Sequence, residues 1–251
     1  MQKIIIPFNE KESLEVFCYT GSFNSGLAVF EDADLKLITA RELAEVRLHA
    51  NPESPVTEFW TYIAENFNYF PNGDVLIASR NYNPFLKSPR DRIATSSSSE
   101  EFYLNKEVIK HLEERAETNP EEAILSGVLR LTLECDKDKA AGEAISRFFF
   151  QDLEEAYLSF VQNLMGTIPP FLVANKDYVK GHKEPFARPF YIDGILDMKI
   201  HPAYLADRFA KHRCNYTDDF FDRFKPKDKI KLSDKGHMFA VQHIPTDSLN
   251  L

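Results

Sequence analysis

The sequence has little cysteine. Cys18, Cys135 and Cys214 are the only three among 251 residues, and they are far apart. An odd number of cysteines without a CxxC pair is not the pattern of a disulfide-stabilised secreted domain. A chain of this length buries enough apolar surface to fold without disulfides or a structural metal. We therefore expect a protein of a reducing compartment and place it in the cytoplasm.

Glycine is also scarce, with nine residues in the whole chain. The sequence contains no GxGxxG or P-loop motif, in which glycine lets the backbone approach a phosphate closely. It has no GxSxG nucleophile elbow and no HExxH pair. These absences argue against nucleotide-binding enzymes, serine hydrolases of the usual arrangement and zinc metalloproteases. We expect no organic cofactor.

Long hydrophobic runs are missing as well. No apolar segment approaches the roughly 20 residues that a helix needs to cross a bilayer. The apolar run at the N-terminus ends at Asn9, and it lacks the long apolar region and small-residue cleavage site of a signal peptide. We expect no membrane partner.

Charge is present in excess but unevenly. The formal net charge is −9, which disfavours wholesale binding to nucleic acid or anionic membranes. Residues 1–170 carry 16 Lys and Arg against 28 Asp and Glu, whereas residues 171–251 carry 14 against 11. This asymmetry suggests an acidic body with a more basic contact surface in its last third.

The patterning of apolar residues predicts an α+β fold. With 43% hydrophobic and 27% charged residues, the composition is typical of a globular protein. We expect one or more mostly antiparallel sheets with packed helices, including one long amphipathic helix at about 139–165. We expect a single domain over 1–251 with a flexible loop at 81–100; a division into 1–135 and 136–251 is the alternative. Strands are predicted at 3–8, 13–20, 26–31, 127–136 and 189–202, at 74–79 after a turn, and in a hairpin over 229–244. Helices are predicted at 39–50, 55–67, 105–116, 119–123 and 139–165; Thr39 and Glu42 form a capping box at the start of the first, and the sequence NPEEA caps the fourth.

The stretch 189–202 alternates between apolar and polar residues. On an extended chain, Phe190 and Ile192 would lie on one face, and Asp193, Asp197 and Lys199 on the other. Antiparallel sheets commonly keep one face in water, so a solvated strand face explains this row without any chemistry.

The triplet Asp197-Met198-Lys199 also resembles the core of the PD-(D/E)xK nuclease motif. That resemblance implies a divalent metal held by Asp197, with Lys199 orienting or activating water as the second catalytic residue. Asp193 is about 13 Å from Asp197 on a regular strand, too far to share one ion unless a bulge at Gly194 shortens the distance. Glu184 is the candidate for the missing acidic ligand. In the motif family the other aspartate usually comes from well upstream, which departs from the spacing of Asp193.

A basic alternation lies nearer the C-terminus. Lysines and aromatic residues close together are the raw material of single-strand nucleic-acid binding. The phenylalanines here also have helical core spacing, and aspartates neutralise part of the charge; a strand edge protected by lysines would look the same. The candidate nucleic-acid-binding residues are Arg223, Lys225, Lys227, Lys229 and Lys231.

Two functional interpretations follow. The first is a non-catalytic intracellular binding or adaptor protein, a subunit of a larger assembly, that contacts a protein partner, or nucleic acid, through its basic C-terminal third. The second is a metal-dependent phosphodiesterase or nuclease, the only interpretation that needs a divalent cation. An enzyme should gather Glu184, Asp193, Asp197 and Lys199 around one concave pocket, whereas a binding module should leave them scattered. We favour the binding protein.

Overall fold

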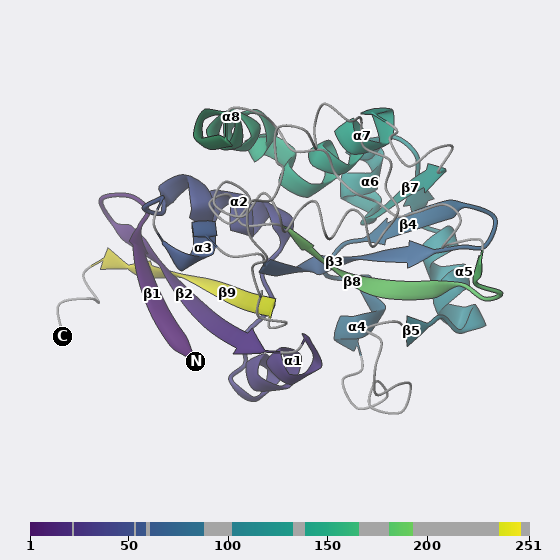
Figure 1. Cartoon of the computed structure of the whole chain (residues 1–251), viewed down its shortest axis with the longest axis horizontal. Coiled ribbons are helices and arrows are strands. Elements are labelled where there is room, and N and C mark those ends of the chain that lie inside the picture. Colours follow the sequence, from purple (N-terminus) through teal and green to yellow (C-terminus); the bar gives the residue numbers. More distant parts are fainter. Residues whose placement is uncertain are drawn as a thin grey trace, which may run out of the picture.

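A computed structural model describes residues 1–21, 23–52, 54–58, 61–87, 102–132, 139–165, 181–192 and 236–246. Helices flank one extended sheet, and the N-terminal and C-terminal strands lie side by side (Figure 1). The strands are β1 (Gln2–Pro7), β2 (Glu12–Gly21), β3 (Thr61–Tyr69), β4 (Asp74–Ala78), β5 (Phe102–Tyr103), β6 (Ala116–Glu117), β7 (Val128–Thr132), β8 (Phe186–Ile192) and β9 (Gly236–Pro245). The helices are α1 (Phe23–Asp32), α2 (Ala40–His49), α3 (Pro55–Glu58), α4 (Pro84–Lys87), α5 (Lys106–Glu113), α6 (Pro120–Ser126), α7 (Lys139–Phe150), the 3₁₀ turn η2 (Gln151–Leu153) and α8 (Glu154–Met165).

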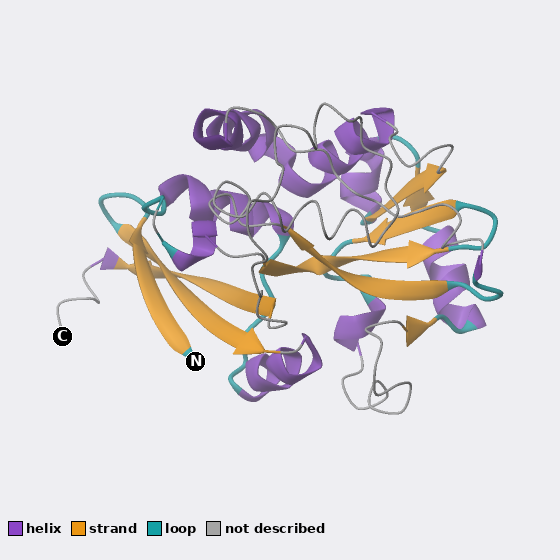
Figure 2. Cartoon of the chain, in the orientation of Figure 1, coloured by secondary structure: helices purple, strands orange, loops and turns teal. Residues whose placement is uncertain are grey.

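The strand order is β1-β2-β9-β3-β4-β7-β6, and β8 pairs with both β3 and β5. Pairing is antiparallel except between β3 and β9 and between β6 and β7. The predicted α+β class, a mostly antiparallel sheet with packed helices, is therefore confirmed (Figure 2).

The sheet is apolar on both faces because its strands send alternate side chains into two separate cores. On β2, Leu14, Val16 and Cys18 enter the core under α2, α7 and α8, while Phe17 enters the core beside α1. On β9, Phe239 joins the first core and Met238 the second. Such two-sided burial hides the polar alternation that marks a half-buried strand.

The predicted start of α2 is confirmed in detail. The Thr39 hydroxyl accepts a 3.1 Å hydrogen bond from the Glu42 N–H, and the Glu42 carboxylate accepts one of 2.8 Å from the Thr39 N–H. This reciprocal capping box satisfies two N–H groups that an uncapped helix end leaves free. Asn105 and Asn119 cap α5 and α6 with their side-chain oxygens: Asn105 Oδ1 accepts from the Val108 N–H, and Asn119 Oδ1 accepts from the N–H groups of Glu121 and Glu122.

The strand predicted at 26–31 is wrong, because these residues belong to α1. Phe23, Gly26, Leu27 and Phe30 are the buried residues of the element, and they recur at the three- and four-residue spacing of a helix. In the sequence, a short apolar run such as residues 26–31 fits a buried strand as well as it fits a helix.

The helix predicted at 55–67 is also wrong beyond Glu58. Pro55 does begin a helix, α3, but it lasts four residues, and β3 runs from Thr61. Every residue of β3 is buried, including Glu65 and two asparagines. A strand covered on both faces carries no period of two, so the sequence pattern did not reveal it.

The range 139–165 is helical as predicted, but it is not one helix. Gln151, with a φ of 52°, and the turn η2 separate α7 from α8. A positive φ cannot continue a right-handed helix, so the chain changes direction there. Within the loop predicted at 81–100, residues Pro84–Lys87 form α4, and residues 88–100 lie outside the described part of the chain. Among the described helices, none has the length and apolarity that crossing a membrane requires.

Candidate functional site

Of the predicted catalytic and metal-binding residues, only Glu184 belongs to the described part of the chain. It is exposed, just before β8. Asp193, Asp197 and Lys199 lie outside the described residues, as do Arg223, Lys225, Lys227, Lys229 and Lys231. Within the ranges that the structure describes, no three His, Cys, Asp or Glu side chains are placed to hold a metal ion together.

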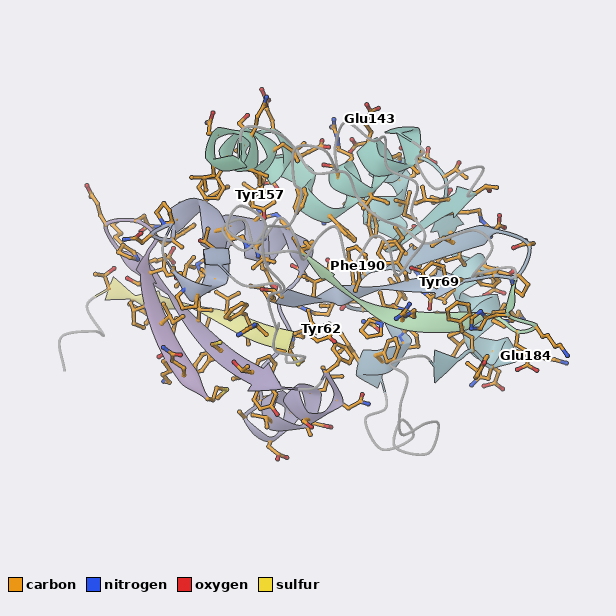
Figure 3. The ribbon with its side chains drawn as sticks, viewed as in Figure 1. Tyr62, Tyr69, Glu143, Tyr157, Glu184 and Phe190 are labelled. Carbon is orange, nitrogen blue, oxygen red and sulfur yellow. The ribbon has the colours of Figure 1, made fainter. Side chains whose placement is uncertain are left out.

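Glu184 and Ile192, the last described residue before Asp193, lie at opposite ends of β8. Glu184 precedes the strand at one end, and Asp193 follows it at the other; seven extended residues span about 20 Å. Figure 3 shows Glu184 at the edge of the molecule, well away from Tyr62, which pairs with Tyr191 near the other end of β8. Two of the three predicted metal ligands, Asp193 and Asp197, lie outside the described residues, so the metal set that they form with Glu184 stays a prediction.

Every other predicted site residue belongs to residues 193–235, which we call the connecting segment because it joins β8 to β9. The strands before and after it pair with opposite sides of the same residue of β3, Thr61. Thr61 pairs with Ile192 of β8 and also with His237 of β9, so the two flanking strands run about 10 Å apart. Both attachment points thus lie at the middle of the sheet.

Aromatic packing holds β8 against β3 and α7. The ring of Phe190 lies 4.3 Å from Phe67 and 5.8 Å from Phe149, measured between ring centroids. At the start of β8, Phe186 stacks on Tyr69 with their ring centroids 5.1 Å apart. The predicted apolar face of Phe190 and Ile192 is confirmed, since both pack against the core under α7.

Close approach of α1 holds β9 in the same way. A Cβ atom placed on Gly26 would lie 2.1 Å from the Met238 sulfur and 2.9 Å from the Tyr19 ring, so a larger residue there would displace these side chains. Tyr62, beside the attachment point, packs its ring 4.9 Å from that of Phe23 of α1. Rigid, well-packed elements therefore carry both ends of the connecting segment.

The sequence analysis missed a buried carboxyl group. Glu65 lies on β3 with 5% of its surface exposed, and its Oε2 accepts a 3.0 Å hydrogen bond from the N–H of Ala40, the first residue of α2. Burial raises the pKa of Glu65 to about 7; the Ala40 N–H and the Arg80 charge oppose this rise. A glutamate in the mostly apolar run TYIAENF was the available signal, but the prediction of a helix over 55–67 left it unexamined.

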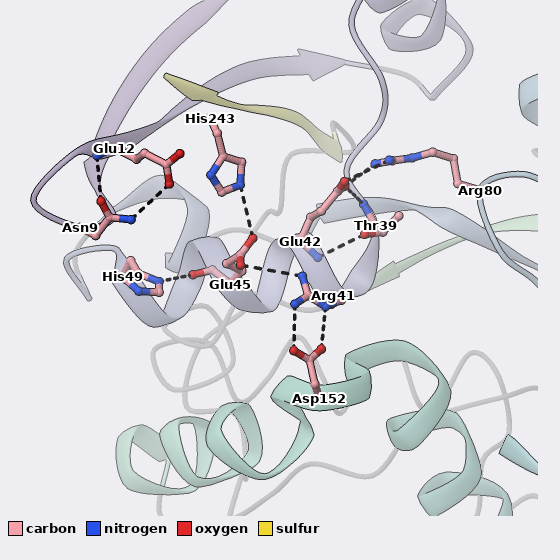
Figure 4. A network of polar contacts seen from close by, with 10 residues as sticks. All are labelled: Asn9, Glu12, Thr39, Arg41, Glu42, Glu45, His49, Arg80, Asp152 and His243. Carbon is pink, nitrogen blue, oxygen red and sulfur yellow. Dashed lines mark hydrogen bonds and ion pairs between the residues drawn. The ribbon is translucent and has the colours of Figure 1, made fainter. Parts of the chain in front are cut away.

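Charged residues around α2 form a wider network (Figure 4). Arg41 donates two hydrogen bonds, of 2.7 and 3.0 Å, to the Asp152 carboxylate of η2, which raises the pKa of Arg41 and lowers that of Asp152. Glu45 lies 3.8 Å from Arg41 and 3.7 Å from His243 Nε2 of β9. The network joins α2 to η2 and to β9.

Neither a protein-family model nor a curated protein matches the sequence. A solved structure is similar, from work on how the C-type lectin fold accommodates massive sequence variation in Nanoarchaeota. The likeness has a TM-score of 0.55 at 11% sequence identity, and it covers 76% of this chain and 91% of the other. The chain therefore has a C-type lectin-like fold.

Proposed function

We propose that the protein is a non-catalytic binding protein that uses its C-type lectin-like sheet to present the connecting segment to a protein partner. The observation that carries the proposal is that the strands before and after this segment both pair with Thr61, through Ile192 and His237. A rigid scaffold that holds the two ends of a long connection is a common way for proteins to carry binding residues.

The similar structure supports this role at the level of the fold. That protein is described as a C-type lectin fold that accommodates massive sequence variation. At 11% identity the two chains share the architecture and little else. A fold that tolerates such change suits a protein whose specificity depends on a variable segment rather than on a fixed catalytic set.

The charge of the connecting segment suggests the character of the partner. Arg223, Lys225, Lys227, Lys229 and Lys231 follow one another at every second position, on a chain whose net charge is −9. We propose that they contact an acidic protein surface, since complementary charges steer association and fix the orientation of a complex. The intracellular assembly expected from the sequence is the setting of this contact.

Affinity capture from a cell extract tests the proposal with three versions of the chain. The first is wild type, and the second replaces the five basic residues by Gln. The control replaces five exposed lysines elsewhere, so that the change in charge is equal: Lys11, Lys36, Lys106, Lys110 and Lys183. We expect wild type and the control to capture a protein that the variant with the five basic residues replaced by Gln does not capture.

Two results would contradict the proposal. If the basic variant keeps every protein that wild type captures, the alternating residues are not the contact surface. If the captured material is nucleic acid, and nuclease treatment removes it, the partner class is wrong and the nucleic-acid alternative replaces it.

A further inference from the structure

β3 and β9 pair over a short stretch and then separate, and residues 37–40 lie between them; we call this region of the sheet the joint. The two strands pair in parallel at Thr61 with His237 and at Tyr62 with Met238. Beyond that point the backbone of a third segment lies between them. The Ile38 N–H donates a 2.8 Å hydrogen bond to the Phe239 carbonyl, and the Ile38 carbonyl accepts one of 2.7 Å from the Ala64 N–H. Ile38 thus bridges the β1-β2-β9 half of the sheet to the β3-β4-β7 half.

Glu65 follows Ala64 on β3 and contacts the same bridging segment. Its carboxyl group accepts the hydrogen bond from the Ala40 N–H, two residues after Ile38. Arg80 holds the segment from the other side: Nε and Nη2 donate to the Leu37 carbonyl at 3.1 and 2.6 Å. The joint therefore depends on one carboxyl group and one guanidinium.

The charges around Glu65 are unbalanced when it is ionised. Among the described residues, Arg80 and Glu42 are the charged groups that act on it. Arg80 already donates to both carboxylate oxygens of Glu42. An ionised Glu65 adds a second carboxylate to a single guanidinium, inside the protein, where an unpaired charge is costly.

We propose that the protonation of Glu65 controls how tightly residues 37–40 hold the two halves of the sheet together. A neutral Glu65 still accepts the Ala40 hydrogen bond and brings no buried charge to the joint. An ionised Glu65 favours states in which the joint opens and water reaches the carboxylate. Burial raises the pKa of Glu65 to about 7, so the change falls near neutral pH. This inference stands independently of the proposed binding role.

Hydrogen exchange measured by NMR tests the joint directly. The readouts are the amides of Ile38, Ala40 and Ala64, expressed as protection factors so that the intrinsic effect of pH on exchange is removed. Between pH 5.5 and 8.5 we expect wild-type protection to fall by about 30-fold, the linkage effect of a carboxyl group whose pKa is about 7 in the closed state and 4.5 in the open one. In Glu65→Gln, protection should not change with pH. Glu107→Gln, which alters an exposed carboxylate in the first turn of α5, should behave as wild type.

The amides of Leu129 and Leu131 in β7 separate a local effect from a global one. If Ile38, Ala40 and Ala64 exchange as slowly as these β7 amides at pH 8.5, they open only when the whole fold unfolds, and the joint is not a local device. Equal pH dependence in wild type and Glu65→Gln would also overturn the proposal. A ¹³C NMR pH titration of the wild-type Glu65 carboxyl group needs no variant. A titration midpoint near pH 7 supports the proposal, and a midpoint near pH 4.5 contradicts it.

Discussion

The Arg47 guanidinium donates a 2.8 Å hydrogen bond to the Tyr157 hydroxyl, and both side chains are buried. The Arg47 Nε also donates a 2.7 Å hydrogen bond to the Val56 carbonyl. One cation thus connects α2, α3 and α8, elements that are distant in sequence. Its helix, α2, is the one whose N-terminus Glu65 and the capping box hold against the sheet.

Replacing Tyr157 by Phe should destabilise the protein by roughly 1–3 kcal/mol, because the change leaves a buried guanidinium donor without its acceptor. The ring contact of Tyr157 with Phe150, at 4.6 Å, survives the change, so the loss reports on the hydroxyl alone. Urea unfolding measures the difference. Tyr103→Phe, at an exposed position, is the control and should change stability by less than about 0.5 kcal/mol. Equal effects of the two variants would show that the Arg47 contact is not made.

Gly127 and Gly142 should respond in opposite directions to alanine. Gly127 caps α6 with a φ of 84°, and an added Cβ would lie 2.3 Å from the Tyr82 ring, so Gly127→Ala should cost roughly 2 kcal/mol. Gly142 lies in α7 with nothing within 4 Å of an added Cβ, so Gly142→Ala should stabilise by about 0.5–1 kcal/mol. Thermal unfolding of the two variants checks both signs. A neutral Gly127→Ala would mean that the left-handed cap is not required.

Local chemistry allowed part of this fold to be predicted. The capping box at Thr39, the cap of α6 and the turn before β4 depend on a few neighbouring residues, and these features were predicted correctly. The helix α1 and the strand β3 depend on tertiary burial instead. Short apolar runs fit either state, and in β3 burial on both faces removed the alternation that identifies a strand.

The candidate site was less predictable than the fold. Sequence patterning found acidic and basic residues close together in the chain, but it cannot show where β8 ends relative to β9. The pairing of Thr61 with both Ile192 and His237 is a relation between three distant segments. Glu65 was missed because its raised pKa depends on burial and on the Ala40 N–H, neither of which is a property of local sequence.

The stability of the protein should carry a pH dependence that Glu65→Gln removes. The pKa of Glu65 is about 7 in the folded protein against 4.5 for an ordinary glutamate, so the folded state holds a proton that the unfolded state has released between these values. The contribution of Glu65 is complete below pH 4.5 and is lost as the pH rises to about 7, an effect of ~3 kcal/mol. In urea unfolding, the free energy of unfolding of Glu65→Gln should rise relative to that of wild type by about this amount between about pH 4.5 and pH 8.

Glu107→Gln is the control for this titration, because it removes an exposed carboxylate instead of a buried one. Its stability should follow the wild-type curve across the whole range. A constant difference between wild type and Glu65→Gln would mean that Glu65 ionises normally in the folded state.

Divalent metal decides between the binding protein and the nuclease interpretation of Asp197 and Lys199. A cation that binds only the folded state at about 100 times its dissociation constant adds about 2.7 kcal/mol, which raises the Tm of a chain of this size by roughly 5–10 °C. For a non-catalytic binding protein we expect millimolar Mn²⁺ or Mg²⁺ to leave the Tm unchanged, in wild type and in Asp197→Ala alike. If metal stabilises wild type but not Asp197→Ala, the ion binds at the Asp-x-Lys triplet, and the proposed function gives way to a metal-dependent phosphodiesterase. Stabilisation of both proteins would place a cation elsewhere and leave Asp197 without the role that its motif suggests.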